Sequence, residues 1–153
     1  MKKFVAVLLA AVLCLSFAAC GGDKDTDKTV DAAAMFQALL TDVTYTDNAT
    51  ELDSSMAGVL LGGELPDGTE AYLAANDSAY LRCAVFACKD KDAAAAVKKL
   101  IQTYIDDSID AKYNVDEVAL LQNAKIHSMG NYVAVAVTSD TDNVNKVIDQ
   151  YFA

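Results

Sequence analysis

The sequence predicts an α+β fold: an antiparallel sheet of about four strands with helices packed on one face. Two observations predict it. Residues 71–88 and 124–139 each have the pattern of a β-hairpin, and each hairpin is followed by a strongly amphipathic helical segment. Strand pairs followed directly by helices favour an antiparallel sheet over the strand–helix alternation of a parallel one.

The segment before the hairpins is predicted to be mainly helical. The first helix is predicted over residues 31–43, where apolar residues recur at the spacing of one helical face: Met35, Phe36, Leu39, Leu40 and Val43. A second, short helix is predicted over residues 50–61, ended by Gly62 and Gly63, and residues 66–68 are predicted to form a turn.

The first hairpin is predicted to pair residues 71–75 with residues 80–88 across a break at residues 76–78. Asp90 or Asp92 then stands where it caps a helix. The apolar stripe of this helix has a regular three- and four-residue spacing: Ala93, Val97, Leu100, Ile101, Tyr104 and Ile105.

The second hairpin follows a short helix, which Asn114 and Glu117 start in the pattern of a capping box. Strands over residues 124–129 and 132–139 flank Gly130-Asn131, a two-residue turn that permits positive φ. Asp140 is predicted to cap the last helix, whose stripe is Val144, Val147, Ile148, Tyr151 and Phe152.

The two hairpin-plus-helix units resemble each other. Val97-x-Lys99-Leu100-Ile101 in the first helix matches Val144-x-Lys146-Val147-Ile148 in the last, and each run is followed three residues on by a tyrosine. An internal ββα repeat explains this match, and so does the shared pattern of any capped amphipathic helix after a strand. The two long helices are expected to cover the same face of the sheet.

The N-terminus has the organisation of an export signal. Lys2 and Lys3 precede an unbroken apolar run over residues 4–15, and Phe17-Ala18-Ala19-Cys20 resembles the bacterial lipobox. In a lipobox, the cysteine thiol receives a diacylglyceryl group and the chain is cleaved just before it. We therefore expect residues 1–19 to be a lipoprotein signal peptide and Cys20 to be lipidated, since residues 4–19 are too short for a spanning helix.

Residues 20–29 are expected to form the lipidated cysteine and a flexible acidic linker, because residues 21–29 contain no apolar side chain. Residues 30–153 are then expected to be a single α+β domain. Loss of Lys2 and Lys3 would leave 10 basic against 22 acidic residues, a net charge of −12. Such a surface repels phosphate backbones, which argues against a nucleic-acid partner, and makes the acyl chains on Cys20 the link to the lipid bilayer.

Two cysteines, Cys83 and Cys88, remain as thiols in the predicted domain. Both lie in the strand predicted over residues 80–88, and their odd separation places them on opposite faces, too far apart for a disulfide bond. We expect them to be unbridged small core residues.

Arg82, the single arginine, is the candidate ligand-binding residue. It is expected to share a strand face with Tyr80, Ala84, Phe86 and Cys88. Its planar guanidinium there either binds a carboxylate or phosphate ligand or pairs with a carboxylate of the chain. On the other hairpin, Tyr132, Ala134 and Ala136 form a stripe that either receives the first helix or stays open as a binding surface.

Catalytic chemistry has little support in the sequence. We found no HExxH, GxSxG, Walker or CxxC pattern, and His127, the one histidine, is expected to be a solvated residue on the more polar face of its strand. Asp106, Asp107, Asp110, Asp116 and Glu117 gather around a helix end, where exposed acidic side chains are favoured over a calcium site. We therefore expect no enzymatic activity, no bound metal and no cofactor.

The stretch of residues 84–97 (AVFACKDKDAAAAV) and the run Gly130-Asn131-Tyr132-Val133 resemble the DUF4358 family, as does the order of elements from Val30 to Ala153. The resemblance implies an exported lipoprotein of anaerobic Firmicutes, in a family whose function is unknown, and it implies no catalytic residues.

These expectations combine into a membrane-tethered extracytoplasmic lipoprotein. Its domain is expected to be a non-enzymatic binding or scaffold module, anchored to the cell membrane, with a protein or another envelope component as its partner. The alternative is an accessory lipoprotein that binds a small solute or a cation, for which Arg82 and the acidic residues are the hints.

Overall fold

A computed structural model describes residues 28–111 and 114–153 of the chain. The predicted signal peptide, Cys20 and most of the predicted linker fall within residues 1–27 and lie outside the described residues.

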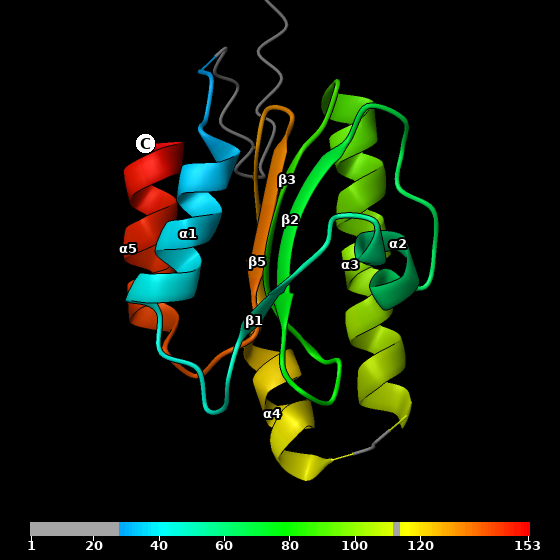
Figure 1. Cartoon of the computed structure of the whole chain (residues 1–153), viewed down its shortest axis with the longest axis vertical. Coiled ribbons are helices and arrows are strands. Elements are labelled where there is room, and N and C mark those ends of the chain that lie inside the picture. The colour runs from blue at the N-terminus through cyan, green and yellow to red at the C-terminus, as the bar shows by residue number, and fades with distance from the viewer. Residues whose placement is uncertain (1–27, 112–113) are drawn as a thin grey trace, which may run out of the picture.

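The centre of the protein is an antiparallel sheet of five strands in the order β1-β2-β3-β5-β4 (Figure 1). Both predicted hairpins are present and the α+β class is confirmed. The strands are β1 (Thr50–Leu52), β2 (Glu70–Ala75), β3 (Leu81–Ala87), β4 (Lys125–Met129) and β5 (Tyr132–Ala136).

Strand β1 corrects the predicted helix over residues 50–61 and adds a fifth strand to the sheet. Thr50, Glu51 and Leu52 pair with Ala75, Ala74 and Leu73 of β2, and only Met56–Leu61 form a helix, α2. The hydrogen bonds that make residues 50–52 a strand come from a segment more than twenty residues away. The local sequence gives no sign of this long-range pairing. The tertiary structure therefore overrides the helical pattern of residues 50–52.

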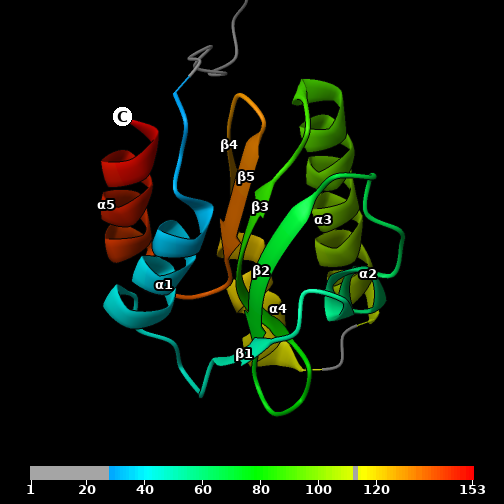
Figure 2. The ribbon, with the colours of Figure 1, turned by 45° about the horizontal axis from the view of Figure 1, so that its top comes forward.

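Helices α1 (Ala32–Asp42) and α5 (Thr141–Phe152) lie side by side on one face of the sheet (Figures 1 and 2). The stripe of Tyr132, Ala134 and Ala136 is buried in the core that also contains residues of α1 and α5, so it is not an open surface. Helix α1 itself lies mainly against β3 and β2. Side chains at the centre of this core are fully buried: Met35, Phe36, Leu39, Cys83, Val85 and Ala134.

Helices α2, α3 (Lys91–Ala111) and α4 (Val115–Asn123) cover the opposite face (Figure 2). Leu73, Ala84, Phe86 and Val135 point to this side and pack with the apolar stripe of α3, including Val97 and Ile101.

The prediction that helices cover only one face of the sheet is therefore wrong. Every residue of β5 and all but the last of β3 are buried. Successive side chains of a strand point to opposite faces, so a strand that is apolar at every position needs a cover on both faces. Val85 accordingly faces α1 and α5, whereas Val135 faces α3.

The ββα repeat fails for the same reason. β3 and β5 are adjacent and antiparallel, so only a two-fold axis normal to the sheet could superpose the two hairpins. That axis would keep both following helices on one face, yet α3 and α5 lie on opposite faces. The matching stripes reflect two amphipathic helices that each pack on a sheet.

Two of the predicted helix caps are present. Asp90 accepts a hydrogen bond from the backbone N–H of Ala93, and Asn114 accepts one from Asp116. Asp31, which was not predicted as a cap, accepts from the backbone N–H of Ala34 in the same way. Asp140 precedes α5 as predicted but makes no side-chain cap. Its carboxylate accepts instead from the Thr44 backbone N–H at 2.9 Å and from the Asn143 side chain.

Cys83 and Cys88 are free, buried and on opposite faces of the sheet, as predicted. Burial raises the pKa of the Cys83 thiol to about 11 and also raises that of Cys88. We expect both thiols to react with a maleimide reagent only after unfolding in urea, because a buried thiol is neither accessible nor ionised. Intact-mass analysis with and without reductant should show no two-hydrogen difference. Rapid labelling of the native protein, or such a mass difference, would contradict this arrangement.

Candidate functional site

Arg82 is placed by a β-bulge. Ala74 pairs with Cys83 but Ala75 pairs with Leu81, so Arg82 is an extra residue in β3 opposite the step between the two alanines. A bulge disrupts the regular alternation of side chains. Leu81 therefore belongs to the core on the α3 side together with Ala84 and Phe86, and the predicted strand-face neighbours of Arg82 do not surround its guanidinium.

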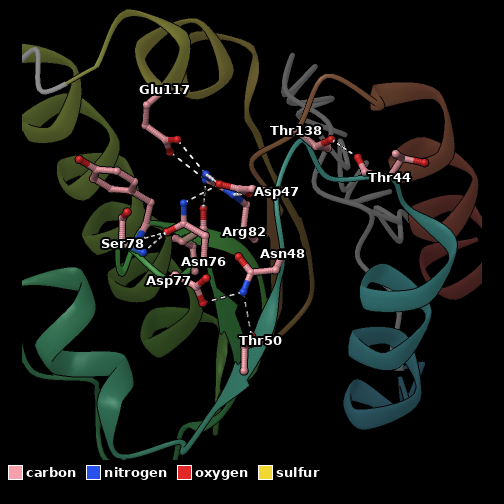
Figure 3. A network of polar contacts seen from close by, with 12 residues as sticks. Thr44, Asp47, Asn48, Thr50, Asn76, Asp77, Ser78, Arg82, Glu117 and Thr138 are labelled. Carbon is pink, nitrogen blue, oxygen red and sulfur yellow. Dashed lines mark hydrogen bonds and ion pairs between the residues drawn. The ribbon is translucent and has the colours of Figure 1, made fainter.

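The guanidinium of Arg82 lies between two carboxylates that come from distant parts of the chain (Figure 3). Asp47, in the loop between α1 and β1, accepts from Nε at 2.7 Å and from Nη2 at 2.9 Å. Glu117, in the first turn of α4, accepts from Nη1 at 2.8 Å and from Nη2 at 2.9 Å. Both contacts are bidentate, the geometry that a planar guanidinium favours.

These contacts use the whole donor capacity of Arg82. Nη1 also donates to the carbonyl oxygen of Leu81 at 3.2 Å, so all five N–H groups have acceptors within the chain. The Arg82 side chain is 1% exposed and that of Glu117 is 8% exposed, whereas that of Asp47 is 38% exposed. Of the two roles considered for Arg82, the structure shows the pairing with carboxylates of the chain and leaves no donor for a ligand.

The hydrogen bonds between Arg82 and Asp47 favour the charged forms of both groups. Hydrogen bonds from Arg82 lower the pKa of Asp47 to about 2. Burial alone would lower the pKa of Arg82, but the hydrogen bonds to Asp47 and Glu117 outweigh it and raise that pKa above its ordinary value. One positive and two negative groups leave a net charge of −1.

The turn between β2 and β3 joins this cluster to the rest of the molecule (Figure 3). Asn76 donates to Asp47 at 2.6 Å and accepts from the backbone N–H groups of Ser78 and Tyr80. Ala79 has a φ of 61°, which a residue other than glycine rarely adopts, so the turn is held in a costly conformation. The cluster thus connects the loop before β1, the β2–β3 turn and α4.

The role of Glu117 differs from the one that its position in the sequence predicts. Its position three residues after Asn114 predicts a capping box, but its carboxylate binds Arg82 instead. Asp47 and Asn76 were not identified at all. One signal pointed to such partners: a single arginine within an apolar strand requires carboxylates nearby, since an unpaired buried charge is very costly.

His127 is less solvated than predicted. It pairs with Ala134, which places it on the face that α1 and α5 cover, and its Nε2 is buried without a hydrogen-bonding partner among the described residues. Burial, and then the charge of Lys125, lowers the pKa of His127, which Asp149 partly opposes. The ring is therefore more strongly neutral at pH 7 than a free histidine.

Two of the acidic residues around the end of α3 and the start of α4 have hydrogen-bond partners within the chain. Asp106 accepts a hydrogen bond from Gln102, and Glu117 is committed to Arg82. Within residues 28–111 and 114–153, no group of three or more His, Cys, Asp or Glu side chains is arranged to hold a metal ion.

A second feature is a cavity of about 400 Å³ beside β2. Ala71 in its wall belongs to the core on the α3 side, whereas Tyr72 packs against the opposite core, where its ring lies 6.2 Å from that of Phe36. A cavity lined by neighbouring residues whose side chains pack on opposite faces lies at the edge of the sheet. The lining residues are Ser54, Ser55, Leu65, Thr69, Glu70, Ala71 and Tyr72.

The segments around this cavity are acidic. From Thr29 to Leu81 the sequence has nine Asp and Glu residues and no Lys, Arg or His. Met56 and Val59 of the neighbouring helix α2 are exposed, Val59 at 73%. Five exposed carboxylates stand on the segments that frame the cavity: Glu51, Asp53, Glu64, Asp67 and Glu70.

The central part of the chain is similar to a known protein family. Residues 66–138 match the family model described as "Domain of unknown function (DUF4358)". The match supports the resemblance found in the sequence. It spans β2 to β5 with α3 and α4, so it includes Arg82 and Glu117 but neither Asp47 nor the helices α1 and α5. No curated protein and no solved structure matches the chain.

In the part of the chain that the structure describes, no helix combines the length and the apolar character needed to cross a membrane.

Proposed function

We propose that this protein is a bacterial lipoprotein, anchored through acylated Cys20 to the extracytoplasmic face of the cell membrane, whose domain acts as a non-enzymatic binding or scaffold module. The anchor rests on the order Lys2-Lys3, apolar run and Phe17-Ala18-Ala19-Cys20. Two acyl chains supply the stable attachment that one chain does not. The resemblance to DUF4358 lipoproteins of Firmicutes agrees with this proposal.

The observation that carries the binding role is the cavity at the edge of the sheet. Its lining combines apolar side chains, hydroxyl groups and a strand segment with no neighbouring strand among the described residues, and the exposed Met56 and Val59 stand on the nearby helix α2. Protein-binding surfaces present such a mixture. The buried charges of Arg82 and Glu117, by contrast, are used in holding loops and α4 together. A domain whose buried charges stabilise its fold, while one edge of its sheet stays accessible, is suited to binding another macromolecule.

The alternative, an accessory lipoprotein that binds a small solute or a cation, has weaker support. An anionic solute would need a free donor on Arg82, and all five are used. A cationic solute would have to use the exposed carboxylates around the cavity, which stand on separate segments.

The anchor is tested by Cys20→Ser. The full-length variant is expected to remain as uncleaved precursor and to incorporate no radiolabelled palmitate, because the thiol is the acyl acceptor and cleavage follows acylation. Cys14→Ser is the matched control, since Cys14 lies within the apolar run and should be removed with it. Labelled protein of mature size from Cys20→Ser, or loss of labelling in Cys14→Ser, would refute the assignment.

A further inference from the structure

On the side away from β3, only half of β2 is paired with another strand among the described residues. β1 pairs with Leu73, Ala74 and Ala75, but no described residue forms a strand beside Glu70, Ala71 and Tyr72 on that side (Figure 1). In an antiparallel ladder, alternate residues direct both N–H and C=O to the same neighbour. This stretch therefore presents unpaired backbone groups along roughly 10 Å of sheet edge.

The cavity occupies the position that a continuation of β1 would fill. Ser54 and Ser55, just after the end of β1, line it together with the uncovered residues of β2. Its walls come from both faces of the sheet, so an extended segment lying there would place alternate side chains on either side of the edge. Leu65 and Ala71 supply an apolar wall on the α3 side.

The negative charge around the uncovered stretch favours a positively charged partner. Glu70 belongs to the uncovered stretch, Glu51 stands on the neighbouring strand β1, and the loops beside them add three further carboxylates. Like charges repel a second copy of the same edge and thereby disfavour self-association through it. A segment with lysine or arginine side chains would instead gain from this field, and its encounter rate would rise.

We infer that residues 70–72 of β2 receive an extended, cationic segment of a partner protein, which pairs with the sheet as a short strand continuing the line of β1. This inference rests on the proposed binding function and names its surface and the chemistry of the partner. Main-chain hydrogen bonds would supply affinity, and the acidic rim with the apolar wall would supply selectivity.

The probe is the blocked hexapeptide acetyl-(Lys-Val)₃-amide, added to the full-length protein in a neutral detergent. We expect binding that weakens with salt and slows amide hydrogen exchange at residues 70–72, while residues 125–129 of the other edge strand, β4, are unchanged. A peptide N-methylated on all six residues should not bind, because none of those residues can donate a backbone hydrogen bond along the strand. Glu70→Lys should weaken binding about three- to tenfold, and the matched control Asp107→Lys, exposed on α3, should not.

Several results would overturn the inference. They are absence of binding, equal binding of the N-methylated peptide, protection at residues 125–129 in place of 70–72, or concentration-dependent protection without peptide, which would make a second copy the occupant. Photo-crosslinkers at position 72 and at Val115, an 84% exposed residue of α4, separate this inference from the proposed function. In intact cells, protein adducts from position 115 alone would overturn the edge site and leave the binding function. Adducts from neither position would count against both.

Discussion

Arg82→Met is expected to destabilise the protein by about 3 to 5 kcal/mol, a large part of the roughly 5 to 15 kcal/mol available to a domain of this size. The loss comes from Glu117, whose carboxylate is almost fully buried and would lose both of its hydrogen bonds to Arg82. Asp47 contributes less, because its more exposed carboxylate can be hydrated. Urea unfolding of the full-length chain, followed by circular dichroism, measures the effect.

Lys125→Met is the matched control, since it removes an exposed cation from a strand of the same sheet. It should change the free energy of unfolding by no more than about 0.5 kcal/mol. The double variant Arg82→Met with Glu117→Leu should recover most of the loss, because replacing a whole buried ion pair by apolar groups is often close to neutral. If Arg82→Met proved as mild as Lys125→Met, the cluster would not hold α4 and the loop before β1 in place.

Ile101→Ala and Ile148→Ala are each expected to cost about 2 to 5 kcal/mol, the usual cost of truncating a buried isoleucine. Ile101 packs in the core between α3 and the sheet, and Ile148 packs in the core between α5 and the opposite face. Gln102→Ala, on the exposed side of α3, should lower stability by no more than about 0.5 kcal/mol.

The double isoleucine variant tests the two-layer arrangement. Because the sheet separates the two cores, the losses should add to within about 0.5 kcal/mol, provided the double variant still folds cooperatively. A large coupling energy would mean that the side chains share one core. If Ile148→Ala were as mild as Gln102→Ala, α5 would not be docked on the sheet.

Much of the local structure could be predicted from the sequence. The three- and four-residue spacing of apolar side chains identified α1, α3 and α5, and Asp90 and Asn114 marked helix starts that the structure confirms. The Gly130-Asn131 turn placed β4 and β5, and Gly130 has the positive φ that this turn permits. These features depend on hydrogen bonds and side-chain spacing within a few residues, so the chain encodes them locally.

The covering of the sheet required the tertiary structure. Helical periodicity says that α3 and α5 each have an apolar stripe, but not which face of the sheet each one packs against. The apolar runs of β3 and β5 indicate that both faces need a cover, but they do not say which helix covers which face. Strand β1 was equally out of reach, since three residues become a strand only by pairing with β2.

The arginine cluster shows most clearly the limit of the sequence. Arg82 as the single arginine, and Glu117 at the start of a helix, were both visible in it. Their meeting was not, because Asp47 and Glu117 each stand 35 residues from Arg82, on opposite sides along the chain. The β-bulge that aims the guanidinium, the loop that carries Asp47 and the docking of α4 together decide that contact. It exists only once those segments are folded, since the burial that makes it strong is absent from the extended chain.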